Sequence, residues 1–148
     1  MNNKVTKHTL AVRVVGSTGE LYWDNADMVV ASAYNGEVGI KPKHAPFLAM
    51  LKPGQVTIIT GEHEEGFYVS GGVIEVQPDI VTILADDAER AKDIDEVKAL
   101  KAKEDATRLL ADKTAKLDYA KLQLQLAQSL AQLRAAKRFK NSAEHKRS

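Results

Sequence analysis

The sequence predicts an N-terminal all-β domain, a flattened sandwich or barrel of about ten strands, followed by a C-terminal antiparallel two-helix hairpin. All nine glycines and all four prolines lie between Gly16 and Pro78, and residues 79–148 contain neither. Because glycine and proline supply turns and interrupt regular structure, only the second half is free to form long helices. The first half also shows alternating apolar runs, whereas apolar residues of the second half recur at helical spacing. We therefore assign residues 1–90 to the β domain and residues 91–148 to the helical domain.

Short apolar runs separated by turn signals fill the first 85 residues. Leu10, Val12 and Val14 alternate with other residues, so one face of that segment is apolar. Further runs occupy residues 28–33, 56–60, 67–69, 73–76 and 80–84, with turns expected at Pro53-Gly54, Ser70-Gly71-Gly72 and Pro78-Asp79. Short strands at this spacing are typical of an antiparallel sandwich or barrel, which can enclose one modest core.

Two helices are expected in the half without glycine. Asp93 or Asp95 can cap the first helix, with Glu96 in its opening turn, and Asp118 can cap the second. Residues 113–117 are expected to form the bend, and the polar residues 141–148 a frayed tail. The expected buried positions recur every three or four residues. They are Ala99, Ala102, Ala106, Leu109 and Leu110 in the first helix, and Tyr119, Leu122, Leu126, Leu130 and Leu133 in the second.

A hairpin of this composition cannot bury much apolar surface by itself. A fully buried leucine contributes roughly 1.5–3 kcal/mol, but the facing alanines remove far less area from water. Isolated helices of ~15 residues are only marginally stable. We therefore expect the hairpin to pack on the β domain or on a partner, with only a small free-energy difference between the two. A small difference of this kind suits a conformational switch.

Composition and charge exclude several classes of protein. The chain has no cysteine, so it has no disulfide, thiolate nucleophile or cysteine metal site. No signal-peptide core opens the sequence and no apolar run approaches the roughly 18 residues of a membrane span, so we expect a soluble, intracellular chain. Residues 1–91 have a net charge of −5 and residues 92–148 of +6, which suggests either different partners or simply a solvated basic helix pair. The pI of about 7.9 and the lone aromatic Phe139 among the last basic residues argue against nucleic-acid binding.

Residues 36–47, GEVGIKPKHAPF, form the most unusual stretch. It matches neither a dinucleotide fingerprint nor a P-loop, and Pro42 and Pro46 prevent a following helix. His44 has Glu37 nearby in sequence but no serine or cysteine nucleophile. We therefore interpret the stretch as a rigid surface turn in which the imidazole hydrogen-bonds the backbone. The histidines show no metal-ligand spacing.

The remaining candidate motifs have structural interpretations. Ser70-Gly71-Gly72 lacks the G-x-S-x-G pattern and is expected to be a tight turn or bulge. Trp23 is interpreted as an apolar anchor at a strand end. The acidic residues before the helices lack an EF-hand pattern, so capping and solvated charge are preferred to a cation site; they are Asp86, Asp87, Glu89, Asp93 and Asp95. The residues alone thus indicate a non-catalytic interaction protein without a metal site.

Several motifs, in order, resemble the ε subunit family of F-type ATP synthases. GEVGI with Pro42 and the HAP of residues 44–46 resembles that family's G-E-x-G-I-x-P-x-H-A-P stretch. KPG at 52–54, YVSGG at 68–72, EVQP at 75–78, VTILAD at 81–86, LDYA at 117–120 and AQLR at 131–134 are similar too. The resemblance covers about residues 8–140. It implies a central-stalk rotor subunit whose sandwich packs on the γ subunit and sits on the c-subunit ring, with Glu37, Lys43 and His44 on the ring side.

The same resemblance implies a mobile hairpin. In the family, the hairpin folds down on the sandwich or extends along γ, where it blocks ATP hydrolysis and its basic second helix meets an acidic segment of the catalytic β subunits, beside the α subunits. The contacts expected here are Arg134, Lys137, Arg138 and Lys140. The chain is then expected to be a non-catalytic, accessory subunit of a proton- or sodium-driven synthase, peripheral at the cytoplasmic face of the bacterial inner membrane.

Some bacterial relatives bind ATP through an I-D-x-x-R-A motif. Residues 94–99 read IDEVKA, so lysine replaces the arginine. The resemblance implies a regulatory ATP site at Glu89, Ile94, Asp95, Lys98 and Ala99. Lysine keeps the charge but lacks the planar fork that grips phosphate, and the second helix has Gln128 and Gln132 where binders carry basic residues. We expect ATP to be a weak regulatory ligand or none, and no cofactor to be required.

Two alternatives remain open. A stand-alone nucleotide or small-molecule binding module, with the hairpin as a lid, would need no γ partner, so co-purification distinguishes it. An enzyme that uses His44 and Glu37 would keep activity as a pure monomer and lose it on His44→Ala.

Overall fold

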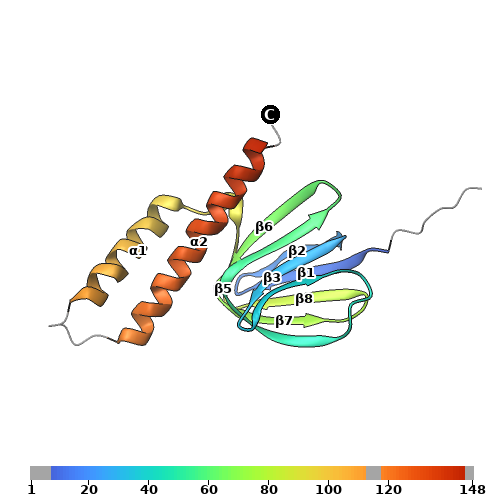
Figure 1. Cartoon of the computed structure of the whole chain (residues 1–148), viewed down its shortest axis with the longest axis horizontal. Helices are drawn as coiled ribbons and strands as arrows, with labels where there is room; N and C mark the ends of the chain where they lie inside the picture. Colours follow the sequence, from blue (N-terminus) through green and yellow to red (C-terminus); the bar gives the residue numbers. More distant parts are fainter. Residues whose placement is uncertain (1–7, 113–117, 146–148) are drawn as a thin grey trace, which may run out of the picture.

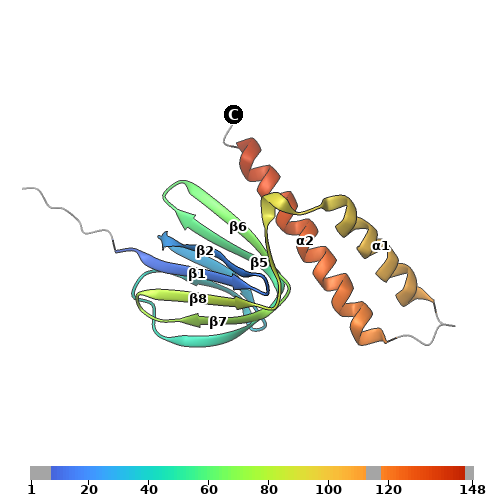
Figure 2. The ribbon, with the colours of Figure 1, turned by 180° about the vertical axis from the view of Figure 1, so that it is seen from behind.

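The computed structural model describes residues 8–112 and 118–145, and it contains a β-sandwich with a two-helix hairpin against one side (Figure 1). The view from behind also shows helix α2 between helix α1 and the sandwich (Figure 2). The strands are β1 (Leu10–Gly16), β2 (Gly19–Ala26), β3 (Met28–Ala33), β4 (Gly36–Ile40), β5 (Phe47–Thr60), β6 (His63–Val69), β7 (Gly72–Val76), β8 (Ile80–Ala85) and β9 (Ala88–Arg90). The short 3-10 helix η1 (Ala91–Asp93) leads to α1 (Glu96–Ala111) and α2 (Tyr119–His145). The predicted fold class is confirmed, with nine strands in the described residues.

The nine strands form one sheet that folds over into two layers. The order β2-β1-β8-β7-β5-β3-β4 makes up most of it, and β6 joins β5 to β9. The pairs are antiparallel except β1 with β8. The first half of β5 pairs with β7 and the second half with β6, so this long strand passes from one layer to the other.

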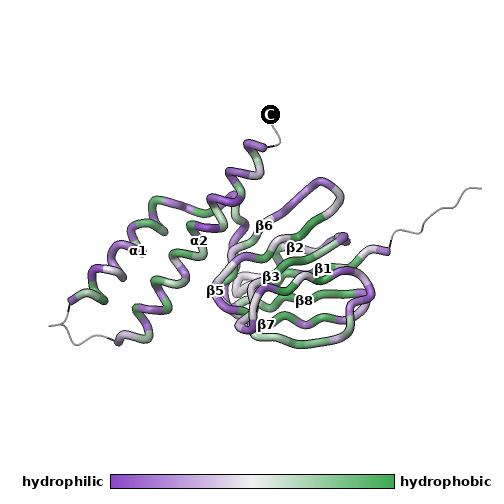
Figure 3. The backbone as a smooth tube through the Cα atoms, viewed as in Figure 1, coloured by the Kyte–Doolittle hydropathy of each residue, from purple (hydrophilic) through white to green (hydrophobic). Residues whose placement is uncertain are grey.

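The core lies between the layers and consists of the inward residues predicted from alternation. Leu10, Val12 and Val14 are fully buried, as are Phe67 of β6 and Ile74 of β7. Branched and aromatic side chains pack well on a pleated surface, which explains why these segments form strands. Figure 3 shows apolar segments along β1 and β8, whereas both helices alternate between apolar and polar residues.

Two predicted turns have different outcomes. Gly71 and Gly72 have φ angles of +133° and +139°, which L side chains rarely adopt, and the Asp86 amide donates to the Gly71 carbonyl at 2.9 Å. This confirms a tight turn there. The turn expected at Pro53-Gly54 was wrong, because β5 continues through it. Pro53 sits where β5 changes partner from β7 to β6, a position that tolerates the missing N–H.

Both predicted helix caps are confirmed. The Asp95 carboxylate accepts from the Lys98 amide at 3.1 Å, and the Asp118 carboxylate accepts from the Lys121 amide at 3.2 Å. The predicted bend at 113–117 lies outside the described residues. The frayed tail was wrong for residues 141–145, because α2 continues to His145.

Two further expectations need correction. Residues 36–40 of the GEVGIKPKHAPF stretch form strand β4 on β3, so the surface turn is confined to residues 41–46. Trp23 is not an apolar anchor, because it lies within β2 and is 56% exposed. Tyr22 faces the core and meets the Phe67 ring at 5.8 Å, so the alternation of β2 turns Trp23 outward beneath the Arg13 guanidinium.

Candidate functional site

The hairpin contacts the sandwich along a narrow seam of small side chains. Ala131 and Ala135 of α2 are buried against Tyr68 of β6 and Ala91 of η1, and Ile94 packs beside them. Small residues let the helix axis approach the sheet closely, but each removes little apolar area from water. The seam is therefore much smaller than the core of the sandwich.

The predicted buried stripe of α2 was only partly correct. Leu122 is buried, whereas Leu126, Leu130 and Leu133 are half-buried and Tyr119 is exposed. Ala131 and Ala135 occupy the positions against Tyr68 and Ala91 instead, because a leucine there would hold the helix away from the sandwich. In α1 the expected Ala99 and Ala106 are buried, and Ala102, Leu109 and Leu110 are half-buried.

Tyr68 places an ionisable group inside the seam. Only 4% of its surface is exposed. Burial, together with the carboxylates of Asp87 and Glu89, raises the pKa of Tyr68 to about 12. The phenol therefore stays neutral at physiological pH and acts as a packing surface.

Two ion pairs flank the seam. Arg138 of α2 lies 3.9 Å from Glu64 of β6, and Lys140 lies 2.6 Å from Glu96 of α1. The first pair joins the helix to the sandwich and the second joins the two helices. Because these side chains are partly exposed, each pair contributes roughly 0.2–1 kcal/mol. Packing and ion pairs together hold the hairpin weakly.

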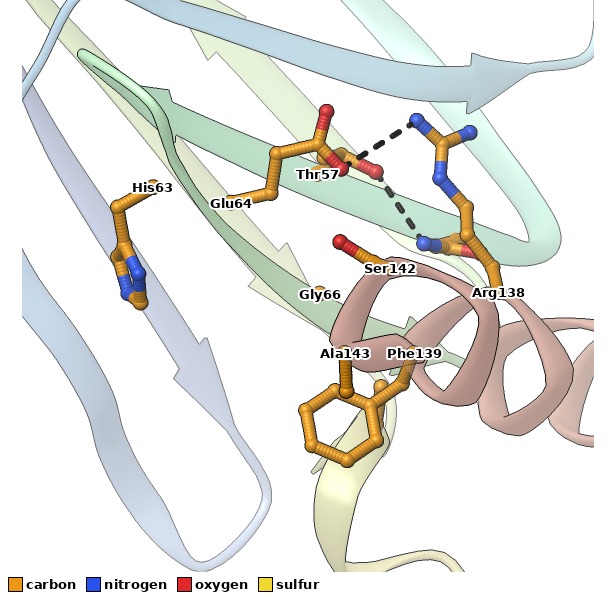
Figure 4. A pocket seen from close by; sticks show the side chains of 10 residues that line it. Thr57, His63, Glu64, Gly66, Arg138, Phe139, Ser142 and Ala143 are labelled. Carbon is orange, nitrogen blue, oxygen red and sulfur yellow. Dashed lines mark hydrogen bonds and ion pairs between the residues drawn. The ribbon is translucent and has the colours of Figure 1, made fainter. Parts of the chain in front are cut away.

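Cavities open beside the seam. One of about 210 Å³ lies between the start of β6 and the end of α2, and is lined by His63, Gly66, Phe139 and Ser142. Figure 4 shows Phe139 and Ser142 on the helix with Arg138 directed toward Glu64. A second cavity, of about 310 Å³, lies between β5 and α2. The hairpin thus touches the sandwich without sealing against it.

The second cavity gathers residues that the sequence assigned to two separate interfaces. Glu37, expected on the c-ring side, lines it together with Arg134 and Arg138, expected to contact catalytic subunits. Lys137 and Lys140 are exposed. All four predicted cations are exposed residues in this arrangement, and their role stays a prediction.

The other predicted ring-side residues lie in the 41–46 turn. Lys43 adopts a φ of 64°, and its amide donates to the Pro78 carbonyl at 2.8 Å. His44 Nδ1 lies 2.8 Å from the Ala45 carbonyl oxygen, and its ring packs 5.3 Å from that of Phe47. The expected backbone hydrogen bond of this imidazole is thus present, and both Lys43 and His44 are tied to nearby backbone.

Sequence reasoning missed an exposed apolar patch next to that turn. Leu48 and Met50 of β5 and Leu84 of β8 are each more than half exposed. Met50 is paired with Val73 of β7, which is paired with Leu84, so their side chains share one outer face. The sequence did contain a signal for this patch, because these apolar residues stand at positions whose side chains strand alternation directs outward.

The residues of the predicted ATP site are engaged in the junction between the sandwich and α1. Asp95 caps α1, Ile94 packs into the seam and Ala99 is buried. Burial, with Asp87 and Asp93 nearby, raises the pKa of Glu89, and Lys98 partly offsets this. Within residues 8–112 and 118–145, no cluster of three or more histidine or acidic residues could hold a metal ion.

Comparison with known protein families shows to which family the chain belongs. The family model described as ATP synthase, Delta/Epsilon chain, beta-sandwich domain matches residues 9–91, and the long alpha-helix domain of the same chain matches residues 92–137. The chain belongs to the ATP synthase epsilon-chain family. Membership makes it an accessory, non-catalytic subunit of ATP synthase.

Curated epsilon chains match along nearly their whole length. The ATP synthase epsilon chain of Acidithiobacillus ferridurans is 48% identical over 132 residues, which cover 89% of this chain and 94% of the relative. The ATP synthase epsilon chain 1 of Methylococcus capsulatus is 49% identical over 133 residues, covering 89% and 95%.

Solved structures share the epsilon-family fold. A chain in the cryo-EM structure of the Euglena gracilis mitochondrial ATP synthase superposes with a TM-score of 0.74 at 19% identity, covering 84% of this chain and 79% of that one. A chain in the Tetrahymena thermophila mitochondrial ATP synthase central stalk and c-ring structure gives 0.58 at 18% identity, covering 86% and 96%. At these identities the likeness concerns the fold. No helix in the described part of this chain is long and apolar enough to cross a membrane.

Proposed function

We propose that the chain is a central-stalk rotor subunit that couples the γ subunit to the c ring of a proton- or sodium-driven ATP synthase. We propose further that its hairpin inhibits ATP hydrolysis. The observation that carries the proposal is the match to epsilon chains over about nine tenths of both lengths. The bacterial relatives support a peripheral position at the cytoplasmic face of the inner membrane.

The exposed apolar patch supports docking of the sandwich on γ. Contiguous apolar surface on a protein that folds around its own core commonly marks a protein contact. Leu48, Met50 and Leu84 form such a surface outside the core. The turn that carries Lys43 and His44, which is held by backbone hydrogen bonds, lies beside it and is our candidate contact with the c ring. A preorganised loop loses little conformational entropy on binding.

The docking proposal is testable by co-purification. A catalytic head that contains γ but lacks this subunit should retain the chain through affinity purification. Met50→Lys should lose retention, because it places a charge in the apolar contact. Val97→Lys is the control, since Val97 is also exposed but lies on α1, outside the sandwich face that carries the patch. Equal retention of both variants would contradict docking through this face.

The narrow seam supports a mobile hairpin. The contact with the sandwich includes the alanines packed around Tyr68 and the long ion pair between Arg138 and Glu64. Release therefore costs little apolar burial, and a competing surface along γ needs only a modest advantage to capture α2. In the extended position, the cations of α2 would meet acidic groups on the catalytic β and α subunits.

The inhibitory role is testable by charge neutralisation. Replacing Arg134, Lys137, Arg138 and Lys140 with glutamine should relieve inhibition of ATP hydrolysis in the assembled enzyme. The control replaces four other cations, the exposed Lys101, Arg108 and Lys121 and the half-buried Lys103, and should leave inhibition intact. Unchanged hydrolysis with the first variant would contradict the proposal.

We propose ATP only as a weak ligand of the Glu89, Ile94, Asp95, Lys98 and Ala99 site. Asp95 is occupied as a helix cap, so its carboxylate is not free to bind Mg²⁺ or ribose without rearrangement. Calorimetry on the isolated chain with MgATP tests this. Tight binding that Lys98→Gln abolishes would contradict weak binding.

A further inference from the structure

The cavity of about 310 Å³ between β5 and α2 concentrates positive charge. Lys52 comes from β5, while Arg134 and Arg138 project from successive turns of α2. Glu37 is the single carboxylate in its lining, so the formal charge around the cavity is positive. Cations gathered around one space repel each other unless an anion lies between them.

These cations have few partners in the protein. Among the described residues, no carboxylate forms an ion pair with Lys52 or Arg134. Arg138 has only the long 3.9 Å pair with Glu64, so its guanidinium keeps donors for another acceptor. The cavity therefore presents charged donors that the protein itself does not satisfy.

Neutral donors complete the lining. The hydroxyls of Ser32 and Thr57 and the amide of Gln55 face the same space. Thr57 is buried, with only 3% of its surface exposed. Its hydroxyl oxygen accepts a hydrogen bond from Gln55 Nε2 at 3.2 Å, so the hydroxyl proton is left to donate to another acceptor. Guanidinium groups and hydroxyls together are the donor set that recognises tetrahedral phosphate.

We propose that this cavity binds a small phosphate-bearing anion, of the size of phosphate or diphosphate. Its volume is at the lower end of ligand pockets, which span roughly 300–1,000 Å³, so a phosphate group fits more readily than a whole nucleotide. The site is separate from the Glu89 and Asp95 region, because none of those residues lines it.

A bound anion would bridge the two parts of the chain. It would contact Lys52 on the sandwich and Arg134 on the hairpin at once, and so stabilise the compact arrangement by linkage. It would also engage Arg134 and Arg138, two of the four cations that we expect to contact the catalytic subunits. This consequence rests on the proposed mobility of the hairpin, whereas anion binding itself does not.

The test is calorimetric titration of the full chain with inorganic phosphate, pyrophosphate and MgATP in separate arms. We expect one-to-one binding of phosphate or pyrophosphate that Lys52→Gln and Arg134→Gln each weaken by about ten-fold or more, since a charge-assisted hydrogen bond is lost. Lys101→Gln and Arg108→Gln remove exposed charges of α1 and should leave binding unchanged. Unaltered melting temperatures would show that all four variants fold.

Three results would overturn the proposal. They are no saturable binding of phosphate or pyrophosphate, equal weakening by the α1 controls, and binding of MgATP alone that Asp95→Asn abolishes while Arg134→Gln retains it. If the anion binds but spin-label distances between the sandwich and α2 do not change, the site stands and the linkage to hairpin position fails.

Discussion

The Arg138 guanidinium lies 3.9 Å from the Glu64 carboxylate, and this ion pair joins α2 directly to the sandwich. Both residues of this pair lie at the edge of the seam between α2 and the sandwich, whose buried residues are mostly alanines. The position of the hairpin therefore depends on a few weak contacts that point mutations can change in either direction.

Glu64→Gln should release the hairpin. A partly exposed ion pair contributes at most about 1 kcal/mol, so the ratio of released to docked hairpin should rise by up to about five-fold. Spin labels on cysteines introduced at Thr60 and Lys137 would measure this by electron paramagnetic resonance distances, since the chain has no native cysteine. Glu20→Gln removes the Arg13–Glu20 pair away from the seam and should leave the distances unchanged.

Ala135→Leu should release the hairpin by a different route. Ala135 is fully buried, and three added carbons would force α2 away from Tyr68 and Ala91 at a cost of about 1–3 kcal/mol. The same spin-label distances should lengthen, while urea unfolding of the sandwich stays unchanged. Ala127→Leu on the exposed side of α2 is the control. Unchanged distances in Ala135→Leu would show that the seam tolerates larger side chains.

Phe67→Ala should destabilise the sandwich itself. Phe67 is fully buried, with Tyr22 at its edge and the Arg90 guanidinium 5.1 Å from its ring centre. We expect the free energy of unfolding to fall by about 3–5 kcal/mol in urea titration. Phe139→Ala, at an exposed position on α2, should cost far less. Similar losses for both variants would contradict the assignment of the core.

Gly72→Ala should be more damaging than Gly36→Ala. Both glycines have positive φ angles, +139° and +123°, so alanine introduces backbone strain of roughly 1–3 kcal/mol at either site. At Gly72 an added Cβ would also overlap the Leu84 carbonyl and lie 2.8 Å from Ala85 Cα, whereas Gly36 has open space. Thermal unfolding should therefore show the larger loss for Gly72→Ala, and equal losses would argue against the tight β7–β8 approach.

Glu89→Gln should stabilise the chain near pH 7. Burial and neighbouring carboxylates raise the pKa of Glu89 above its ordinary value of 4.5, so the folded state binds this proton more tightly than the unfolded state. Its contribution to stability is present below pH 4.5 and is lost as pH rises through the folded pKa. Glutamine mimics the protonated acid and should remove this part of the pH dependence in urea titrations. The control Glu62→Gln, at an exposed position, should leave this pH dependence unchanged.

Local physics predicted much of the fold. Alternation identified the buried side of β1 through Leu10, Val12 and Val14, and Asp95 and Asp118 identified both helix starts, because these signals depend only on neighbouring residues. The alanine seam was not predicted, since hydrophobic periodicity favours leucines while close helix approach favours small residues. The meeting of Glu37 with Arg134 depends on how the hairpin docks, which sequence spacing does not contain.

The contacts at the link between the sandwich and the hairpin could not be predicted from the sequence either. Arg90 pairs with Glu65, and its guanidinium also donates to the Leu21 carbonyl at 2.5 Å. These contacts join three strands at the point where the chain leaves the sandwich. No local motif marks this arginine, because its partners are distant in sequence and come together only in the folded sheet.

The most direct test of the central claim is ATP hydrolysis by an assembled enzyme whose hairpin can be locked. Cysteines at Glu62 and Ser142, which line one cavity across the β6–α2 junction, can be joined by a short reversible thiol cross-linker. The account predicts that the locked chain stays bound but does not inhibit hydrolysis, and that cleaving the linker restores inhibition. Equal hydrolysis rates with the hairpin locked and released would contradict it.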